Sequence, residues 1–320
     1  MAEMDETRLL VKLARMYYQQ DMTQAQIAAR VSMSRQKVQR LLRKSRETGV
    51  VHILIRPAAG AFPDLERALE DRYDLKDAVI ADVDNGAGQA QATQAAAAAA
   101  AEYLTRAFRS RDRIVVAWGG NVHHTIEALY HHPRPAVRDI SVIQGFGGLG
   151  DTSDEEHIAF LTQRLAAWFG VPGRMMPAPA LAGTVQARKA FCGDPSISSV
   201  LESARHANLL ITGIGSPASA IRCARALKST HPELSGMPVA RAAGDINLRF
   251  FDEKGQVVPS DFDDRMIGLS LRDLKAIDTV VAVAAGAKKL RPILAALRGH
   301  LVNVLVTDHA VAIRLLETPR

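Results

Sequence analysis

The stretch TQAQIAARVSMSRQKVQRLLRKSRETG, residues 23–49, reads as two short helices joined by a tight turn. Thr23 is a good N-cap, and Gln26 three residues later completes the spacing of a capping box. Ser34 stands where it can cap a second helix, and Gly49 is placed to end that helix. The stretch therefore predicts a helix-turn-helix.

The second of these helices would carry a face suited to reading DNA. Val38, Leu41 and Leu42 follow helical spacing and turn inward, which leaves long Arg and Gln side chains on the solvent side. Such side chains pair with guanine and adenine edges, and the first turns of a recognition helix reach deepest into the groove. We expect base contacts from Arg35, Gln36, Gln39 and Arg40, phosphate contacts from Lys37, Arg43 and Lys44, and capping contributions from Thr23 and Ser34. The alternative is an ordinary helical hairpin with a solvated basic side.

The distribution of charge favours the first interpretation. Residues 1–56 hold 11 basic residues (Lys and Arg) against 5 acidic residues (Asp and Glu). The remaining residues hold 29 basic and 29 acidic residues. The net charge of +6 therefore belongs entirely to the N-terminal segment. A local excess of this kind attracts a polyanion, while a chain made basic for solubility would spread its charge.

Length and composition indicate one minor and one major globular domain. The chain has 320 residues, of which 48% are hydrophobic and 23% charged. We expect a DNA-binding domain at 1–56, a linker helix at 57–76, and a domain for effector binding and oligomerisation at 77–320. No apolar run reaches membrane-spanning length and the N-terminus MAEMDE is acidic, which favours the cytoplasm. Cys192 and Cys223 are the only cysteines, and we interpret both as buried small hydrophobes.

The elements around the hairpin can be placed from their apolar spacing. Leu9, Leu10, Leu13 and Met16-Tyr17 predict a first helix packed across the next two. Val50–Ile55 reads as a wing or exit strand, and Pro57–Gly60 reads as a linker. A connecting helix with Pro63 in its first turn follows, and its apolar positions are Phe62, Leu65, Leu69 and Tyr73.

From Asp77 onward, short apolar runs alternate with helical stretches, which predicts an α/β domain with a parallel sheet covered by helices. The alanine tract Ala95–Ala101 fits a tightly packed helix. The strand candidates are Ala78–Ala81, Ile114–Trp118, Ile140–Ile143, Leu209–Thr212, Thr279–Val283 and Val302–Val306.

Glycine and small polar residues follow four of these strands. In open parallel sheets, ligands bind beyond the carboxyl ends of the strands. Glycines let backbone amides approach an anion, and a helix N-terminus behind the loop favours negative charge. Four such loops around one crevice would suit a phosphate. The loops are Gly119-Gly120-Asn121, Gly145–Gly150, Gly213-Ile214-Gly215-Ser216 and Ala285-Gly286-Ala287-Lys288-Lys289.

Several other motifs do not predict a dinucleotide site, a metal site or a catalytic nucleophile. Gly145–Gly150 matches GxGxxG, but Arg174–Pro179 offers no acidic residue for a ribose, so a dinucleotide site is not predicted. The pairs His123-His124 and His131-His132 lack a neighbouring carboxylate or Cys, so no metal site is expected. Ser216 lacks a cue for a paired base. Asp151–Glu156 reads as the start of a helix Glu155–Phe169.

The stretch Gly244-Asp245-Ile246-Asn247 leaves two interpretations open. An Asp between Gly and a β-branched residue, followed by Phe250-Phe251-Asp252 and a Gly255 turn, could orient a sugar hydroxyl. The same residues could form a hairpin with a carboxylate in its turn.

The chain resembles the SorC-type, or deoxyribonucleoside-regulator-like, sugar-binding transcriptional regulators of bacteria over nearly its whole length. Six pieces in the order of that family carry the resemblance. They are TQAQIAARVSMSRQKVQRLLRKSRETGVVHI at 23–53, VVAWGGNVHHTIEAL at 115–129, VIQGFGGLG at 142–150, LITGIGSP at 210–217, GDINLRFFDEKG at 244–255 and VAVAAGAKKLRPILAALRGHLVNVLVTD at 281–308.

The resemblance implies a winged-type helix-turn-helix joined to a doubly wound effector domain of the sugar-phosphate isomerase-like class. It also implies dimers or tetramers that bind a palindromic operator of double-stranded DNA. The effector would be a phosphorylated sugar or a sugar-like metabolite, and no cofactor is expected. Carried over by position, Gly119, Gly120 and Asn121 would cradle the phosphate with Gly147 and Gly148, Asp245 would meet sugar hydroxyls, Lys289 would neutralise the phosphate, and Gly215, Ser216, Gly286 and Asp308 would complete the site.

Two residues depart from the family pattern. Asn121 stands where the family usually has Ser or Thr, and Ala285 stands where it has a second glycine. A longer amide and an added methyl group would change how an anion is held. Two further hypotheses remain: a sugar-phosphate isomerase or deaminase relative fused to a DNA-binding module, with Asp245 or Asp308 as base, and a nonspecific nucleic-acid-binding protein. The residues do not reveal the effector, the operator or the sign of regulation.

Overall fold

The computed structural model describes residues 2–51, 61–84, 88–148, 157–226 and 236–319. The chain divides into two compact units, Met1–Ala58 and Ala59–Arg320. No helix in the described ranges is both long and apolar enough to cross a membrane.

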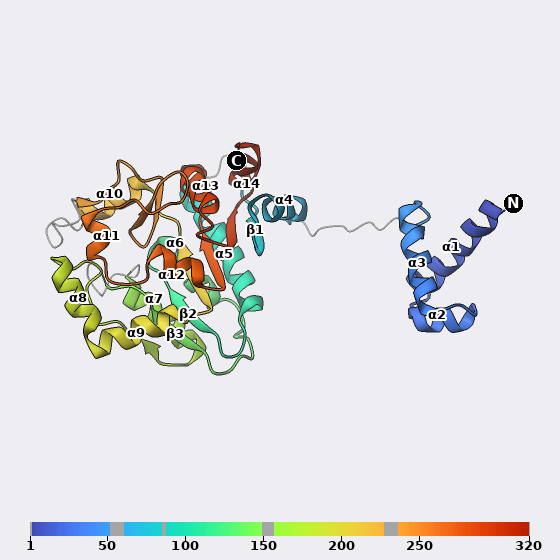
Figure 1. Ribbon diagram of the computed structural model, residues 1–320, viewed down its shortest axis with the longest axis horizontal. Coiled ribbons are helices and arrows are strands. Elements are labelled where there is room, and N and C mark those ends of the chain that lie inside the picture. The colour runs from blue at the N-terminus through green and yellow to red at the C-terminus, as the bar shows by residue number, and fades with distance from the viewer. Residues whose placement is uncertain (1, 52–60, 85–87, 149–156, 227–235, 320) are drawn as a thin grey trace. The chain divides into compact units, whose positions relative to one another are not determined.

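The first unit consists of three helices, α1 (Ala2–Tyr18), α2 (Gln24–Arg30) and α3 (Arg35–Glu47) (Figure 1). Leu13, Ile27 and Val38, one from each helix, are fully buried and form the centre of its small core. Thr23 caps α2 through the expected capping box, since its side chain accepts from Gln26 N and the Gln26 side chain accepts from Thr23 N. The sequence thus specifies the starts of α2 and α3, because Ser34 also accepts from the amide of the third residue of α3.

The end of α3 follows the expected pattern only in part. Thr48 is the C-cap and Gly49 adopts a left-handed φ of 74°, the conformation that glycine accepts at low cost. The expected wing strand cannot be compared, because most of Val50–Ile55 and the whole linker Pro57–Gly60 lie outside the described residues.

The second unit is built on a seven-stranded sheet in the order β1-β9-β8-β5-β2-β3-β4, in which every pair is parallel. The six expected strands are present, although β2 ends at Val116 and β9 begins at Val304. The short strand β4 is not among the six candidates and overlaps the Arg174–Pro179 region only at Arg174. The strands are β1 (Asp77–Ala81), β2 (Arg113–Val116), β3 (Ser141–Gln144), β4 (Gly173–Arg174), β5 (Leu209–Gly213), β8 (Thr279–Val283) and β9 (Val304–Asp308).

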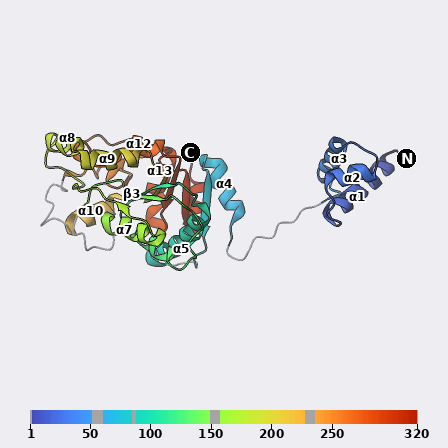
Figure 2. The same cartoon turned by 90° about the horizontal axis from the view of Figure 1, so that it is seen from below.

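Helices cover both faces of this sheet, which is why its strands are continuous apolar runs. Helices α4, α5, α6, α7, α9 and α14 all contact strands of this sheet. Figure 2 shows β3 between α9 and α12 on one side and α7 on the other. The helices are α4 (Pro63–Tyr73), α5 (Gln89–Ala107), α6 (Gly120–Leu129), α7 (Ile158–Phe169), α8 (Val185–Gly193), α9 (Pro195–Arg205), α10 (Pro217–Ala226), α11 (Asp261–Arg265), α12 (Leu271–Ala276), α13 (Leu290–Arg298), α14 (His309–Glu317) and the 3-10 turn η2 (Ala287–Lys289).

Some of the features predicted for individual helices are present in the structure and others are not. The alanine tract lies inside α5, where Ala96, Ala97, Ala100 and Ala101 are buried. Helix α7 begins at Ile158 with His157 as its N-cap, whereas the Asp151–Glu156 stretch expected to begin it lies outside the described residues. The interpretation of Cys192 as buried was wrong, because this side chain is partly exposed.

The strand order contains one reversal of direction. The chain runs outward from β2 through β3 to β4, and then returns to β5, on the other side of β2, and continues through β8 to β9. The loops after β2 and β5 therefore leave the sheet toward opposite sides. Such a switch point opens a crevice at the carboxyl ends of the strands.

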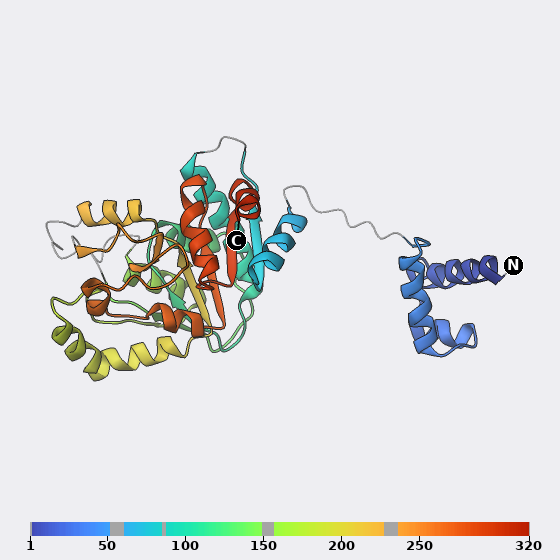
Figure 3. The same ribbon diagram turned by 45° about the horizontal axis from the view of Figure 1, so that its top comes forward.

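A two-stranded hairpin, β6 (Gly244–Ile246) and β7 (Arg249–Phe251), lies outside the main sheet and next to α10 (Figures 1 and 3). A backbone bridge between Gly215 and Asp245 joins it to the loop after β5. The stretch therefore forms a hairpin, as one of the two interpretations expected, but Asp245 lies in strand β6 and the turn consists of Asn247 and Leu248.

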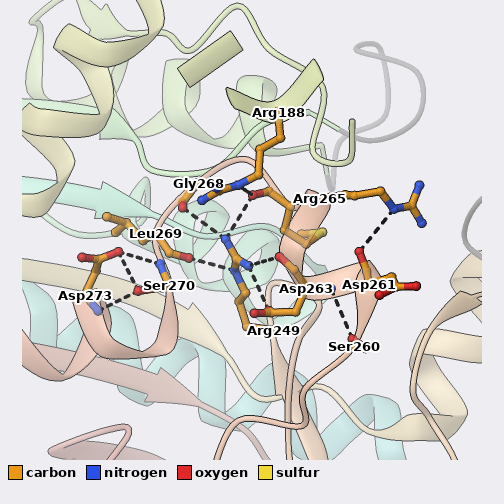
Figure 4. A network of polar contacts seen from close by, with 11 residues as sticks. Arg188, Arg249, Ser260, Asp261, Asp263, Arg265, Gly268, Leu269, Ser270 and Asp273 are labelled. Atoms are coloured by element: carbon orange, nitrogen blue, oxygen red, sulfur yellow. Dashed lines mark hydrogen bonds and ion pairs between the residues drawn. The ribbon is translucent and has the colours of Figure 1, made fainter. Parts of the chain in front are cut away.

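The buried Arg249 anchors this hairpin to the segment that follows it (Figure 4). Its side chain is 3% exposed. Its guanidinium donates to the carboxylate and carbonyl of Asp263, both at 2.9 Å, and to the carbonyls of Leu269, Gly268 and Met266 at 3.1, 3.2 and 3.3 Å. A planar group with five donors can satisfy all of these acceptors at once.

We expect Arg249→Lys to lower the free energy of unfolding by about 3 kcal/mol, because a lysine keeps the charge but leaves several buried carbonyls without a donor. Urea unfolding of the full chain measures this change. Arg241→Lys is the matched control, since Arg241 is exposed and donates to a single carbonyl, that of Pro259. Equal destabilisation by the two substitutions would contradict the anchoring role.

Candidate functional site

A cavity of about 280 Å³ opens at the switch point of the sheet. Residues from the loop after β2, the loop after β5, the start of α10, the β6–β7 hairpin and η2 surround it. The described part of the chain holds no group of three or more His, Cys, Asp and Glu placed to bind a metal ion. The lining consists of Trp118, Gly119, Gly120, Asn121, Gly213, Ile214, Gly215, Ser219, Ala220, Arg222, Asp245, Asn247, Leu248 and Lys289.

The N-terminus of α6 forms one wall of this cavity. Gly119 precedes the helix at a φ of 114°, and no side chain caps the helix there. The first amides of a helix have no partner within the helix and carry the positive end of its dipole, so this wall is suited to an anion. Asn121 lines the wall, but its side-chain amide donates to the carbonyl of Val283 at 2.7 Å. The amide therefore ties this loop to the end of β8.

Asp245 is a buried carboxyl on the opposite wall, with 6% of its surface exposed. Burial raises its pKa to about 6, although a hydrogen bond from Leu248 N and the positive charge of Lys289 act in the other direction. Gly215 lies against this carboxyl so closely that a Cβ there would come within 2.0 Å of Asp245 Oδ1. Only glycine fits at that position, so the glycine serves the packing of the carboxylate.

Lys289 brings a positive charge to the same cavity. Its ammonium donates to the carbonyl of Ile214 at 2.7 Å. Burial lowers the pKa of Lys289, and Asp245 opposes that shift. The site thus combines a desolvated cation, a desolvated carboxyl and a helix N-terminus, which together suit a ligand that carries both an anionic group and hydroxyls.

Sequence reasoning missed the turn of the hairpin and the side chains of α10. Asn247 and Leu248 line the cavity in left-handed conformations with φ values of 50° and 60°. Ser219 and Arg222 line it from α10. The sequence did indicate Asn247, because it stands two residues after Asp245, which was already a candidate. It did not indicate the α10 side chains, because they do not directly follow a strand.

Other predicted effector residues are not part of this lining, and their backbone polar groups are used within the chain. Gly147 N donates to Ile267 O at 3.0 Å, and Gly148 N donates to Ala178 O at 2.9 Å. A Cβ on Gly147 would lie 2.1 Å from the carbonyl oxygen of Pro179. These two glycines permit close backbone packing, and Gly147 also lines a small neighbouring cavity with Trp118 and Asn247. Their place in a phosphate cradle stays a prediction.

Three further predicted residues, Ser216, Gly286 and Asp308, are also not part of this lining, and their role at the effector stays a prediction. Ser216 does not line the cavity, and its hydroxyl contacts that of Ser219 at 3.0 Å. Gly286 N donates to the Asp308 carboxylate at 2.6 Å, and the other oxygen of that carboxylate accepts from Val311 N to cap α14. Asp308 is therefore a helix cap. Ala285 is buried in the core and also lies outside the lining, so its methyl group does not narrow the cavity.

The predicted DNA-contacting side chains divide into two groups. Arg35, Gln36, Lys37, Gln39 and Arg40 are exposed on α3. Arg43 pairs with Glu47 at 2.8 Å and Lys44 pairs with Glu6 at 2.5 Å. Tyr17 and Tyr18, which the sequence argument did not select, are exposed and line a groove with Arg35. Within the part of the chain that the structure describes, the polar side chains at the start of α3 form no ion pair, whereas Arg43 and Lys44 in its later turns do.

Known proteins resemble this chain over almost its full length. Residues 59–317 match the family described as "Putative sugar-binding domain". The sorbitol operon regulator of Klebsiella pneumoniae is 30% identical, covering 99% of this chain and 100% of that protein. The deoxyribonucleoside regulator of Bacillus subtilis is 29% identical, covering 98% of each. The crystal structure of the full-length Klebsiella regulator, SorC, matches with a TM-score of 0.71 over 98% of this chain and 99% of that one.

The raised pKa of Asp245 makes stability depend on pH in a definite direction. The folded chain keeps the proton up to about pH 6, whereas the unfolded chain releases it near the ordinary value of 3.8, so stability falls as pH rises from about 4 to 6 and stays lower above that. We expect Asp245→Asn to be more stable than the wild type by about 1–3 kcal/mol at pH 7.5 and to lose this advantage at pH 4.

Thermal unfolding of both proteins across this pH range measures the difference. Asp264→Asn, at an exposed carboxyl on α11, is the control and should show a difference that stays constant. An Asp245→Asn advantage that does not change between pH 4 and 7.5 would contradict the assignment.

Proposed function

The chain belongs to the SorC-type family of sugar-binding bacterial transcriptional regulators, and from this premise we propose that it binds operator DNA under the control of a phosphorylated sugar or sugar-like metabolite. The proposal for the ligand rests on one observation: the buried carboxyl of Asp245 and the ammonium of Lys289 line the same cavity, at the N-terminus of α6.

The first unit supplies the DNA contacts in this proposal. It is a helix-turn-helix of the winged type, with α3 as the recognition helix. The capped starts of α2 and α3, the exposed face of α3 and the confinement of the net charge of +6 to residues 1–56 support this. Arg35, Gln36, Gln39 and Arg40 contact bases, and Lys37 contacts phosphates. Arg43 and Lys44 reach phosphates by exchanging their present ion pairs for DNA.

The second unit supplies the response. In the proposed complex, the phosphate lies at Gly119, Gly120 and Asn121 with Lys289 as its counter-charge, and sugar hydroxyls donate to Asp245. The domain is of the sugar-phosphate isomerase-like, doubly wound class. The carboxyl with a pKa near 6 can accept such hydrogen bonds at neutral pH, since it is then mostly ionised.

In this proposal, ligand binding to the second unit and DNA binding by the first are thermodynamically linked. The protein acts as a homodimer or tetramer on a palindromic operator. The ligand binds one arrangement of the DNA-binding units more tightly than the other. DNA affinity then changes by no more than that difference in ligand affinity.

A second function has one observation in its favour. A buried carboxyl with a pKa near 6 beside a lysine is what a general base in a sugar-phosphate isomerase would need. The relatives are named as regulators, and we propose that this chain does not catalyse the reaction. A turnover assay on hexose and pentose phosphates decides between the two functions, and measurable isomerisation that Asp245→Asn abolishes would favour the enzyme.

We expect Arg35→Ala to weaken binding to the operator by about 1–3 kcal/mol while changing affinity for random duplex DNA far less. Fluorescence anisotropy with both DNAs at fixed salt measures this. Arg15→Ala removes the same charge from an exposed position on α1, where Arg15 contacts Gln19, and should leave the ratio of the two affinities unchanged. Equal loss of specificity in both variants would argue against α3 as the reading helix.

We expect a sugar phosphate at one hundred times its dissociation constant to stabilise the folded chain by about 2.7 kcal/mol, seen as a rise in melting temperature. Lys289→Met should abolish this rise, because the phosphate loses its counter-charge. Lys288→Met is the control, since Lys288 is exposed and outside the cavity. A rise that persists in Lys289→Met and disappears in Lys288→Met would place the anion elsewhere.

A further inference from the structure

The loop of the β6–β7 hairpin is held in an unfavourable conformation. It consists of Asn247 and Leu248 alone, between Ile246 and Arg249, and both loop residues have positive φ. Two-residue hairpin loops of this kind favour Asn followed by Gly. A leucine in the left-handed region costs roughly 1–2 kcal/mol. Strain of this kind persists where the surrounding structure enforces it, and it is often found at ligand sites.

Asn247 also has one half of its amide unpaired. Its side chain is 6% exposed, and its Oδ1 accepts from Trp118 N at 3.1 Å, which fixes the orientation of the amide. Its Nδ2 is buried and has no hydrogen-bond partner among the described residues. A buried donor left unpaired costs about 1–3 kcal/mol. The hairpin turn therefore contributes to the cavity lining a residue whose amide donor is buried and unsatisfied.

Two other asparagines show that this is not the general use of the residue in the chain. Asn208 accepts from Arg113 N and donates to the Asp112 carboxylate. Asn303 accepts from Val280 N and donates to the carbonyl of Asp278. Both link strands or loops with both ends of the amide. Asn247 uses only its acceptor end, and it is the one of these three that lines the cavity.

We propose that Asn247 is a specificity-determining ligand contact, whose Nδ2 donates to an oxygen of the effector next to a hydroxyl that donates to Asp245. This inference rests on the proposed function and narrows its ligand class. A donor and an acceptor presented from one hairpin fit two neighbouring hydroxyls, so the effector carries a vicinal diol beside its anionic group. A site built to pair with a hydroxyl rejects analogues that lack it, because its own polar group then stays unpaired.

The same residue connects the ligand to the wall that holds the anion. Through Oδ1, Asn247 fixes the backbone of Trp118, which directly precedes Gly119 and the first turn of α6. A ligand held by Nδ2 thus restrains the hairpin and the α6 wall together. Trp118 lines the cavity, and the only other tryptophan, Trp168, is buried against Phe108 and Phe169. Trp118 fluorescence therefore reports on ligand binding once Trp168 is replaced by phenylalanine.

The test titrates the full chain carrying Trp168→Phe with ribose 5-phosphate, 2-deoxyribose 5-phosphate, glucose 6-phosphate, fructose 6-phosphate and sorbitol 6-phosphate. Asn247→Asp keeps the acceptor for Trp118 N but replaces the donor by a second acceptor. Asn247→Gly removes the amide and supplies a residue that favours the left-handed turn, so the fold is retained if the aspartate variant fails to fold. We expect each variant to weaken binding of the sugar phosphates at least tenfold (roughly 1.4 kcal/mol).

Asn303→Asp is the control, because it removes a structural amide donor outside the cavity. It should lower the melting temperature and leave ligand affinity within about twofold. Affinity within twofold of wild type in Asn247→Gly, for every sugar phosphate that the wild type binds, would overturn the role of Asn247 and leave the proposed function intact. A wild-type chain that binds none of the five compounds would overturn both.

Discussion

The reversal of strand order between β2 and β5 is the constraint on which the candidate site depends. Because the chain leaves these two neighbouring strands toward opposite sides, their loops separate and leave a cavity at the carboxyl end of the sheet. The N-terminus of α6 enters from one loop, and Gly215 presents its backbone from the other. The β6–β7 hairpin then closes the crevice by pairing with Gly215, which places Asp245 opposite the helix end.

This closing hairpin concentrates features that lower stability. Asp245 is buried with a raised pKa, the Asn247 amide has an unpaired donor, and Leu248 adopts a left-handed conformation. The contacts of Arg249 behind the hairpin offset these costs by fixing it to the segment around α11 (Figure 4). Unfavourable groups that a rigid anchor holds at one cavity wall are expected where a ligand supplies the missing partners.

Much of the fold could be predicted from the sequence because its signals are local. The caps at Thr23 and Ser34 and the apolar strand runs depend on neighbours a few residues apart, and the structure contains them. The function of the glycine loops could not be predicted from the sequence, because glycine serves both anion binding and close packing. Gly147 lies against the backbone of Pro179, a contact that no local pattern reveals. Ser219 and Arg222 of α10 carried no local signal, so their place in the cavity required the three-dimensional structure.

The central claim is that ligand binding in this cavity changes the affinity of the first unit for DNA. Thermodynamic linkage requires the effect to be reciprocal. The most direct measurement determines the dissociation constant of the operator with and without a bound sugar phosphate, and that of the sugar phosphate with and without operator. We predict that both constants change by the same factor, of roughly 5- to 150-fold. A sugar phosphate that binds tightly while the affinity for the operator stays constant would contradict the claim.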